Sequence, residues 1–159
     1  ESIAECLAAG VVDEATLDVA EAVADADLII LCTPVGRMGE LAAAIGGNVG
    51  FLLDAWHWYN AGESAEDLRL LSAEQVVDVH VNDAPDIPVD EQVDNVRTLP
   101  GETGVIDIVA FLGTLKNIGY DGPVMVEPFS HELRQMEAEE AVAATAVALD
   151  KVWGQAGLL

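Results

Sequence analysis

The residues of this sequence that are able to do chemistry are polar side chains placed at the ends of short apolar runs. Asp54 and His57 follow one such run, His80 and Asp83 close a second, and Glu127 closes a third. The carboxyl ends of parallel strands face a common crevice in α/β proteins, and ligands bind there. Two carboxylates and an imidazole that meet in this crevice would form a nitrogen and oxygen site for a divalent metal. The pattern therefore predicts a metal site at these strand ends.

Apolar runs that alternate with helical patterns have to position these residues. We predict strands at 27–33, 49–53, 76–81 and 123–126, and helices at 2–9, 13–24, 37–45, 65–71, 106–118 and 137–153. Asp13 or Thr16 is the expected cap of the second helix. Strands separated by helices indicate a parallel sheet with right-handed crossovers. About four such βα units make either half of a barrel or a small open sheet, and the acidic segment 84–104 is a long loop.

The charge balance is strongly acidic and excludes several kinds of partner. The 159 residues include 29 Asp and Glu against six Lys and Arg, a formal net charge of −23. Nucleic acids and anionic membrane surfaces are bound through Lys and Arg, so we expect neither as a partner. Two origins stay open for this composition: a protein that must stay soluble at high salt, where repulsion is screened, or an ordinary acidic bacterial protein.

The length and the apolar runs favour one globular α/β domain over residues 1–159. No apolar run reaches the roughly 18 residues of a membrane span, and the first residues do not form a secretory signal, so we expect a cytoplasmic protein. Cys6 and Cys32 are the two cysteines. We expect reduced thiols, with a disulfide as the alternative.

From about residue 48 to residue 159 the sequence resembles the sugar phosphate isomerase/epimerase family, whose members are xylose-isomerase-like TIM barrels. The motifs that carry the resemblance occur in the family's order. They are Leu53-Asp-Ala-Trp-His57, Val79-His-Val-Asn-Asp83, Arg97-Thr-Leu-Pro-Gly-Glu102, Gly119-Tyr-Asp-Gly-Pro123 and Val126-Glu-Pro-Phe129.

The resemblance implies a role for each matching residue. Asp54, His80 and Glu127 would bind a divalent metal such as manganese or magnesium, and Glu127 would also act as one of two acid/base carboxylates. His57 and Arg97 would hold substrate oxygens. Asp83 would sit behind these groups and orient His80 or the following loop. A carboxylate beside a metal-chelated hydroxy-ketone is able to remove and return a carbon-bound proton.

The first part of the chain departs from the family pattern. The family's fourth metal ligand and second base is a Glu at the end of the preceding strand, where this sequence has Thr33. Residues 1–45 instead resemble a segment of prephenate-dehydrogenase-type Rossmann domains, through Ala9-Gly-Val-Val-Asp13 and Ala24-Asp-Ala-Asp-Leu-Ile-Ile-Leu-Cys-Thr-Pro-Val35. The glycine-rich phosphate loop of such domains is missing, so we expect no nicotinamide cofactor. The apparent join lies near 46–48, between a Rossmann-like fragment 1–47 and a half-barrel fragment 48–159.

Two functional hypotheses follow. The first is a remnant or partial metal-dependent sugar or sugar-phosphate isomerase/epimerase, with catalysis weakened by the missing carboxylate. The alternative is a non-catalytic chimeric α/β scaffold or binding module. Because an open sheet leaves strand edges and an apolar face uncovered, we expect either a half-TIM-barrel that pairs into a homodimer or an open Rossmann- or flavodoxin-like sheet. Trp56, Trp58 and Tyr59 would line a sugar pocket, cover the sheet, or form an exposed patch.

Overall fold

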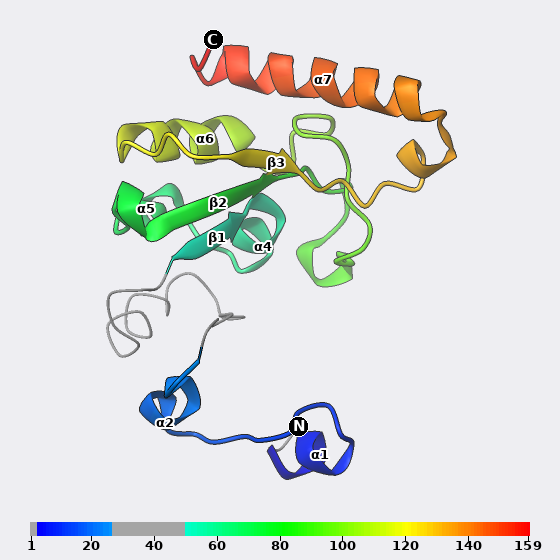
Figure 1. Cartoon of the computed structure of the whole chain (residues 1–159). Helices are drawn as coiled ribbons and strands as arrows, with labels where there is room; N and C mark the ends of the chain where they lie inside the picture. Colours follow the sequence, from blue (N-terminus) through cyan, green and yellow to red (C-terminus); the bar gives the residue numbers. More distant parts are fainter. Residues whose placement is uncertain (1–2, 27–49) are drawn as a thin grey trace. The chain divides into compact units, whose positions relative to one another are not determined.

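The computed structural model describes residues 3–26 and 50–159, which belong to two compact units of the chain (Figure 1). The first unit contains the short helices α1 (Ile3–Ala8) and α2 (Val19–Val23). Cys6 is a free thiol in α1. The strand predicted at 27–33, the helix predicted at 37–45, Thr33 and Cys32 all lie outside the described residues. The predicted single domain with a join near 46–48 stays a prediction.

Helix α2 begins later than predicted because a different residue caps it. The Asp18 carboxylate accepts hydrogen bonds from the backbone N–H groups of Ala20 and Glu21, which satisfies the first free donors of the helix. The predicted caps Asp13 and Thr16 are therefore wrong. Thr16 lies outside the helix, where its hydroxyl accepts a hydrogen bond from the Asp18 N–H.

The second unit is built on three parallel strands in the order β1-β2-β3. They are β1 (Phe51–Asp54), β2 (Val76–Val81) and β3 (Val124–Val126), and they lie side by side in Figure 1. The predicted parallel α/β sheet is confirmed, with strand bounds within two residues of those expected. Within residues 50–159 the sheet is open rather than closed into a barrel.

Four α-helices and three short 3₁₀ helices connect and cover these strands. They are α4 (Ala55–Asn60), α5 (Ala65–Leu68), α6 (Ile108–Asn117), α7 (Ala138–Gln155), η1 (Ala73–Gln75), η2 (Val89–Glu91) and η3 (Leu133–Gln135). Helix α4 contacts β1 and β2, while α6 contacts both α5 and α7. The helices predicted at 65–71, 106–118 and 137–153 are present, the first two with shorter bounds. Helix α4 was not predicted.

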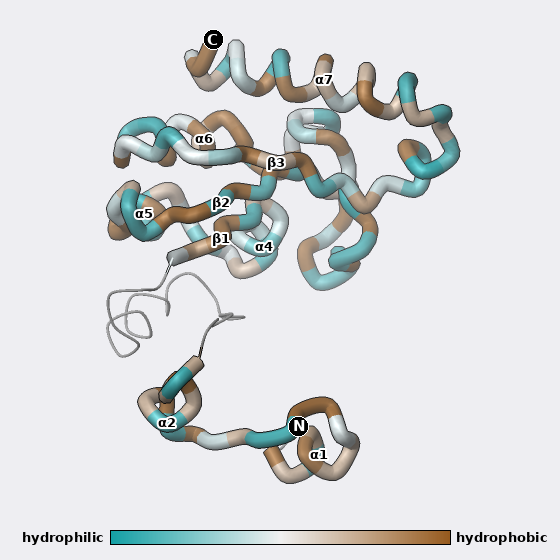
Figure 2. The backbone as a smooth tube through the Cα atoms, viewed as in Figure 1, coloured by the Kyte–Doolittle hydropathy of each residue, from teal (hydrophilic) through white to brown (hydrophobic). Residues whose placement is uncertain are grey.

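The register of the sheet separates an apolar core face from a face that carries the polar residues. Leu53 pairs with Val79 and Val79 with Val124, and the first two side chains are fully buried with Phe111 of α6 in the core. Figure 2 shows hydrophobic residues in the strands, consistent with this core. On the other face Asp54 pairs with His80, and His80 pairs with Met125.

No helix within residues 3–26 and 50–159 is both long enough and apolar enough to cross a membrane.

Candidate metal site at the strand ends

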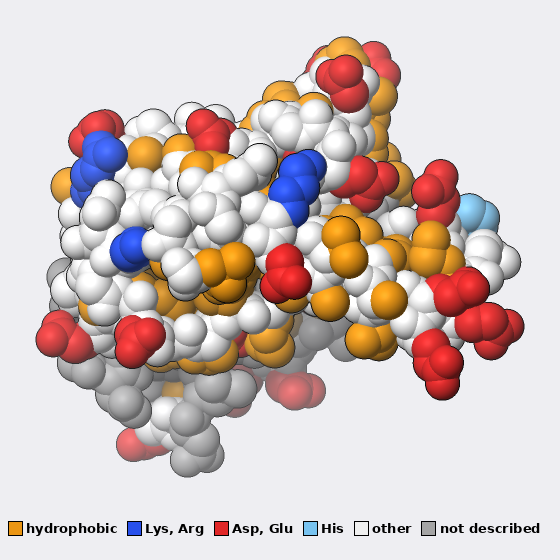
Figure 3. Space-filling model, turned by 90° about the horizontal axis from the view of Figure 1, so that it is seen from above, with side chains coloured by type: hydrophobic (Ala, Val, Ile, Leu, Met, Phe, Trp, Pro, Cys, Tyr) orange, Lys and Arg blue, Asp and Glu red, His pale blue; other side chains and the backbone are white. Residues whose placement is uncertain are grey.

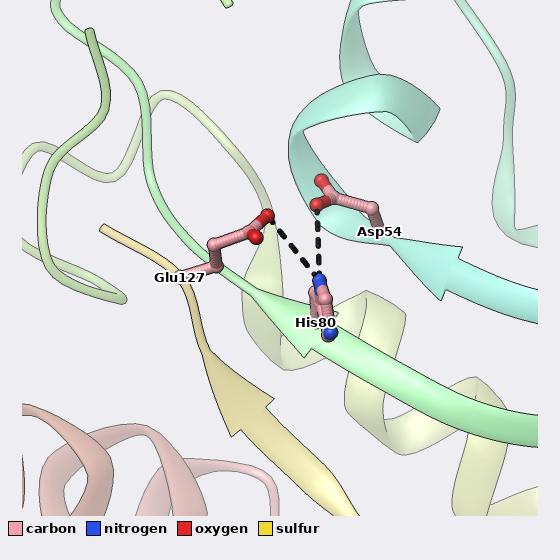
Figure 4. Close-up of side chains that lie close together, drawn as sticks. All are labelled: Asp54, His80 and Glu127. Carbon is pink, nitrogen blue, oxygen red and sulfur yellow. Dashed lines mark hydrogen bonds and ion pairs between the residues drawn. The ribbon is translucent and has the colours of Figure 1, made fainter. Parts of the chain in front are cut away.

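Asp54, His80 and Glu127 converge at the carboxyl ends of β1, β2 and β3 (Figure 4). One ligand atom from each residue lies within 4.8 Å of the others. The His80 Nδ1 atom is 3.3 Å from Glu127 Oε2 and 3.8 Å from Asp54 Oδ2. The parallel register places these residues together because each follows the apolar part of its own strand. The three predicted metal ligands therefore share one edge of the sheet.

Asp54 uses its two carboxylate oxygens for different partners. Oδ1 accepts hydrogen bonds from the backbone N–H groups of Trp56 (2.8 Å) and His57 (3.2 Å), which makes Asp54 the N-cap of α4. Oδ2 faces His80 and Arg97. The cap holds the carboxylate in one orientation, since both oxygens are engaged and the side chain is only 6% exposed.

His80 and Glu127 each have a polar neighbour on the side away from the cluster. The Nε2 atom of His80 lies 3.8 Å from an oxygen of Asp78, while its Nδ1 atom faces the carboxylates. The backbone N–H of Glu127 donates to the side-chain oxygen of Asn82 at 3.0 Å, and Asn82 is fully buried. Sequence reasoning did not assign a role to Asn82, although it stands between the two motif residues His80 and Asp83.

Arg97 lies at the centre of the site rather than on its rim. Its guanidinium donates from Nη1 to Asp54 Oδ2 (2.8 Å) and to Glu127 Oε2 (3.1 Å), and its side chain is 2% exposed. Its Nε and Nη2 groups donate to the backbone and side chain of Asp94 at 2.8 and 2.7 Å. Four of the five N–H groups of the guanidinium thus donate to oxygen atoms, and Nη2 also lies 3.4 Å from His57 Nε2.

Two aromatic rings complete the surroundings of Arg97. Its guanidinium carbon is 5.1 Å from the ring centroid of Trp56 and 5.0 Å from that of Phe129, distances at which a cation is attracted to a ring face. Trp58 instead packs against Phe111 in the core. Trp58 therefore has one of the predicted roles, that of apolar cover for the sheet. Trp56 instead contacts the guanidinium of Arg97. Tyr59 is half-buried.

Asp83 holds the loop that carries Arg97. Its buried carboxylate accepts four backbone hydrogen bonds of 2.7–3.1 Å, from the N–H groups of Ala84, Thr103, Gly104 and Ile106. Its backbone also pairs with that of Thr98 as an isolated antiparallel bridge. The sequence predicted that Asp83 orients either His80 or the following loop. The hydrogen bonds of its carboxylate are to the loop.

The predicted substrate residue His57 is the most open member of the cluster. Its side chain is 62% exposed, and its Nε2 atom lies 3.4 Å from Asp94 as well as near Arg97. Asp94 was not expected in the site, because it lies in the aperiodic acidic segment and gives no signal of its own in the sequence.

The donor set suits a divalent cation. Two carboxylates and a neutral imidazole are ligands that manganese, magnesium and zinc accept in proteins. Asp54, Glu127 and Asp94 carry three negative charges here against the single positive charge of Arg97, so a further cation would be attracted. In this arrangement Asp54, His80 and Glu127 are the residues that would hold a divalent ion, with the exposed His57 nearby.

The profile of the xylose isomerase-like TIM barrel family matches residues 20–151. The chain belongs to this family. The family resemblance of the C-terminal part is thus confirmed, and the match begins before the predicted join at 46–48. The resemblance of residues 1–45 to a Rossmann segment stays a prediction.

Two similar proteins are inosose isomerases. The sequence is 38% identical over 95 residues to inosose isomerase of Bacillus licheniformis, covering 60% of this chain and 34% of that protein. It is 36% identical over 108 residues to inosose isomerase of Halalkalibacterium halodurans, covering 67% of this chain and 38% of that protein. The chain thus spans about a third of the length of the curated relatives it matches.

Solved structures share the fold as well. The crystal structure of IOLI protein with a binding zinc atom superposes with a TM-score of 0.67 at 31% identity, covering 73% of this chain and 42% of that one. A xylose isomerase domain protein from Alicyclobacillus acidocaldarius gives a TM-score of 0.68 at 36% identity, covering 77% of this chain and 44% of that one. The open three-stranded sheet therefore corresponds to part of a sugar isomerase-like barrel.

Proposed function

We propose that this chain carries a divalent metal site of the sugar isomerase/epimerase type, with Asp54, His80 and Glu127 as its ligands. The observation that carries the proposal is the convergence of one ligand atom from each of three successive strand ends within 4.8 Å. The relatives named inosose isomerase and the zinc atom in the IOLI structure support it. By the same reasoning the substrate is a small sugar-like molecule.

The surrounding residues have roles in this proposal that follow from their positions. Asp54, His80 and Glu127 would hold the ion, which would supply stabilisation of negative charge on substrate oxygens next to the carbon that loses its proton. Glu127, whose side chain is 36% exposed, moves that proton. His57, the open histidine, contacts substrate oxygens, with Arg97 behind it. If, as the family resemblance implies, Thr33 takes the place of the second carboxylate, turnover would be about 10²–10⁴-fold below that of a site with both bases.

A specific observation favours the non-catalytic scaffold as the second candidate. Arg97 compensates the charges of Asp54 and Glu127 directly, at 2.8 and 3.1 Å. One arginine thus pairs with both carboxylates in the absence of any ligand, so the cluster has an arrangement that needs no metal. The two candidates differ in whether the cluster takes up a metal.

The test is calorimetric titration of chelator-stripped protein with Mn²⁺ and Mg²⁺ at fixed salt concentration. We expect saturable binding of one ion in the unchanged protein and its loss in Glu127→Gln, which removes a ligand charge without removing the cap of α4. Asp54→Ala should lose binding too, although it also weakens α4 by about 1 kcal/mol. The exposed Asp86→Asn is the matched control and should bind as the unchanged protein does. Absence of binding in the unchanged protein would leave the scaffold as the function.

A further inference from the structure

Arg97 and His80 face the same two carboxylate oxygens. The Nη1 atom of Arg97 is 2.8 Å from Asp54 Oδ2 and 3.1 Å from Glu127 Oε2. His80 Nδ1 lies 3.8 and 3.3 Å from these same two atoms. The oxygens that would ligate a metal together with His80 are therefore the ones that accept hydrogen bonds from Arg97.

We propose that Arg97 competes with the metal for Asp54 and Glu127 and thereby sets the metal affinity of the site. This inference rests on the metal site proposed above and assigns Arg97 a positioning role toward the ligands, in addition to any contact with substrate. On metal binding the Nη1 group leaves the two oxygens, while the remaining donors of the guanidinium keep their partners.

The distances make simultaneous binding unfavourable. Zinc and magnesium ions sit about 2.0–2.2 Å from carboxylate oxygens. With Nη1 2.8 Å from Asp54 Oδ2, an ion on that oxygen would lie within about 5 Å of the guanidinium nitrogen. Two cations at that separation repel each other strongly at a site where the arginine is 2% exposed, because little water screens them.

In the proposed metal-bound state the guanidinium takes a second position, closer to Asp94. Asp94 accepts from both Nε and Nη2, and its own side chain is 59% exposed. Trp56 and Phe129 contact the guanidinium at centroid distances of 5.1 and 5.0 Å. A small displacement toward Asp94 keeps the Asp94 bonds and the ring contacts, and gives up only the two bonds from Nη1. In that state Asp94 would hold Arg97 away from the ligands.

The first experiment measures Mn²⁺ affinity by calorimetry in Arg97→Gln and in the unchanged protein. Removing the competing cation should tighten Mn²⁺ binding by about tenfold or more, which corresponds to about 1.4 kcal/mol. Arg69→Gln is the matched control: it removes the same charge from an exposed arginine paired with Glu66, and it should leave the affinity unchanged.

The role of Asp94 follows from a double-mutant cycle. Asp94→Asn should weaken Mn²⁺ binding, because Arg97 then depends more on Asp54 and Glu127. In the Arg97→Gln background the same change should have a much smaller effect, since there is no arginine to redirect. Equal effects in the two backgrounds would show that Asp94 acts on the metal directly and would overturn the second position for Arg97.

A spectroscopic measurement follows the arginine itself. Because the guanidinium lies against Trp56, titration with Zn²⁺ should change tryptophan emission in the unchanged protein. The change should be absent in Trp56→Phe and much reduced in Arg97→Gln. A merely structural role for Arg97 would not produce this pattern.

The outcomes separate the two proposals. If the unchanged protein binds Mn²⁺ and Arg97→Gln binds it equally or more weakly, the competition is overturned while the metal site stands. If neither protein binds, the metal site itself fails and the competition with it. Where circular dichroism shows that Arg97→Gln does not fold, Arg97→Met replaces it, because it also removes the charge while keeping an apolar stem between Trp56 and Phe129. The same tightening is expected, and its absence overturns the proposal.

Discussion

At the scale of single residues, the site is built from side chains that serve structure and ligand at once. Asp54 is a helix cap through Oδ1 and a candidate ligand through Oδ2. The backbone of Glu127 is fixed by the buried Asn82. A side chain that is already fixed by a hydrogen bond within the protein loses little additional conformational entropy when a ligand binds, because it already occupies one rotamer. The cluster is therefore preorganised by the local folding of the strand ends.

Asp83 offers the clearest stability prediction at this scale. Asp83→Asn replaces one acceptor oxygen by an NH₂ group that would face backbone N–H donors and hydrogen-bond none of them. We expect the free energy of unfolding to fall by about 2–4 kcal/mol, since four charge-assisted hydrogen bonds are disturbed in a fully buried position.

Urea denaturation measures this change, with the exposed Asp86→Asn as the matched control. The control should stay within about 0.5 kcal/mol of the unchanged protein. An Asp83 variant as stable as the control would mean that the carboxylate does not hold the loop.

The sequence predicted some of these residues better than others for a physical reason. Asp54, His80 and Glu127 each end an apolar strand, so pattern alone brings them to one edge. Arg97 and Asp94 lie in an aperiodic acidic segment. The position of Arg97 depends on hydrogen bonds to Glu127 and Asp54, which are 30 and 43 positions away in the chain. No local signal encodes such contacts, so the burial of Arg97 was not predictable from its neighbours.

At the scale of elements, the strands were predicted closely and one helix was missed. The strand at 76–81 has the predicted bounds because four of its six residues are the β-branched Val, and three of these (Val76, Val79 and Val81) are buried in the core. Helix α4 contains Trp56, His57, Trp58 and Tyr59, which have only moderate helix propensity. It forms because Asp54 caps it and because Trp56 and Trp58 are buried. A tertiary contact thus outweighs the local preference.

The turn before β3 gives a prediction on pH. Tyr120 donates its hydroxyl to the Pro123 carbonyl at 2.7 Å, and burial together with the nearby Asp78 carboxylate raises the pKa of Tyr120 above its usual value of 10.0. The unfolded chain therefore loses this proton first. The stabilisation is complete below pH 10 and is lost as the pH rises through the folded-state pKa.

We expect the unfolding free energy of the unchanged protein to fall more steeply above pH 10 than that of Tyr120→Phe. Urea denaturation of both proteins at several pH values between 8 and 11.5 measures the difference between their unfolding free energies. Groups that titrate alike in both proteins do not contribute to this difference. Parallel curves would contradict a raised pKa for this tyrosine.

At the scale of the whole molecule, two features have opposite effects on the pairing of two copies. The open sheet favours pairing, and the large negative charge opposes it. Leu52 and Met125 are each 47% exposed on strands of the sheet, which agrees with the predicted need for a covering partner. The predicted homodimer stays a prediction. Acidic side chains predominate over basic ones on the face seen in Figure 3, so repulsion opposes any pairing of two copies at low salt.

The same charge leads to a prediction on salt. Among the basic residues of the described part, Arg97 is used inside the site, and Lys116 and Lys151 donate to the backbone carbonyls of Gly157 and Gly101. The formal net charge of −23 would remain even if each of the six basic residues were paired with a carboxylate. We expect the melting temperature to rise with NaCl concentration up to about 1 M, because the screening length falls from about 30 Å at 0.01 M to about 3 Å at 1 M.

The shape of this curve separates the two origins that the composition leaves open. Screening of repulsion is nearly complete at about 1 M, so an ordinary acidic protein should reach a plateau there. A protein adapted to high salt should continue to gain stability above that concentration. Glu139 and Glu140 are exposed acids in the first turn of α7, and changing both to Gln should flatten the rise below 1 M in either case. A melting temperature independent of salt would mean that self-repulsion does not limit the stability of this fold.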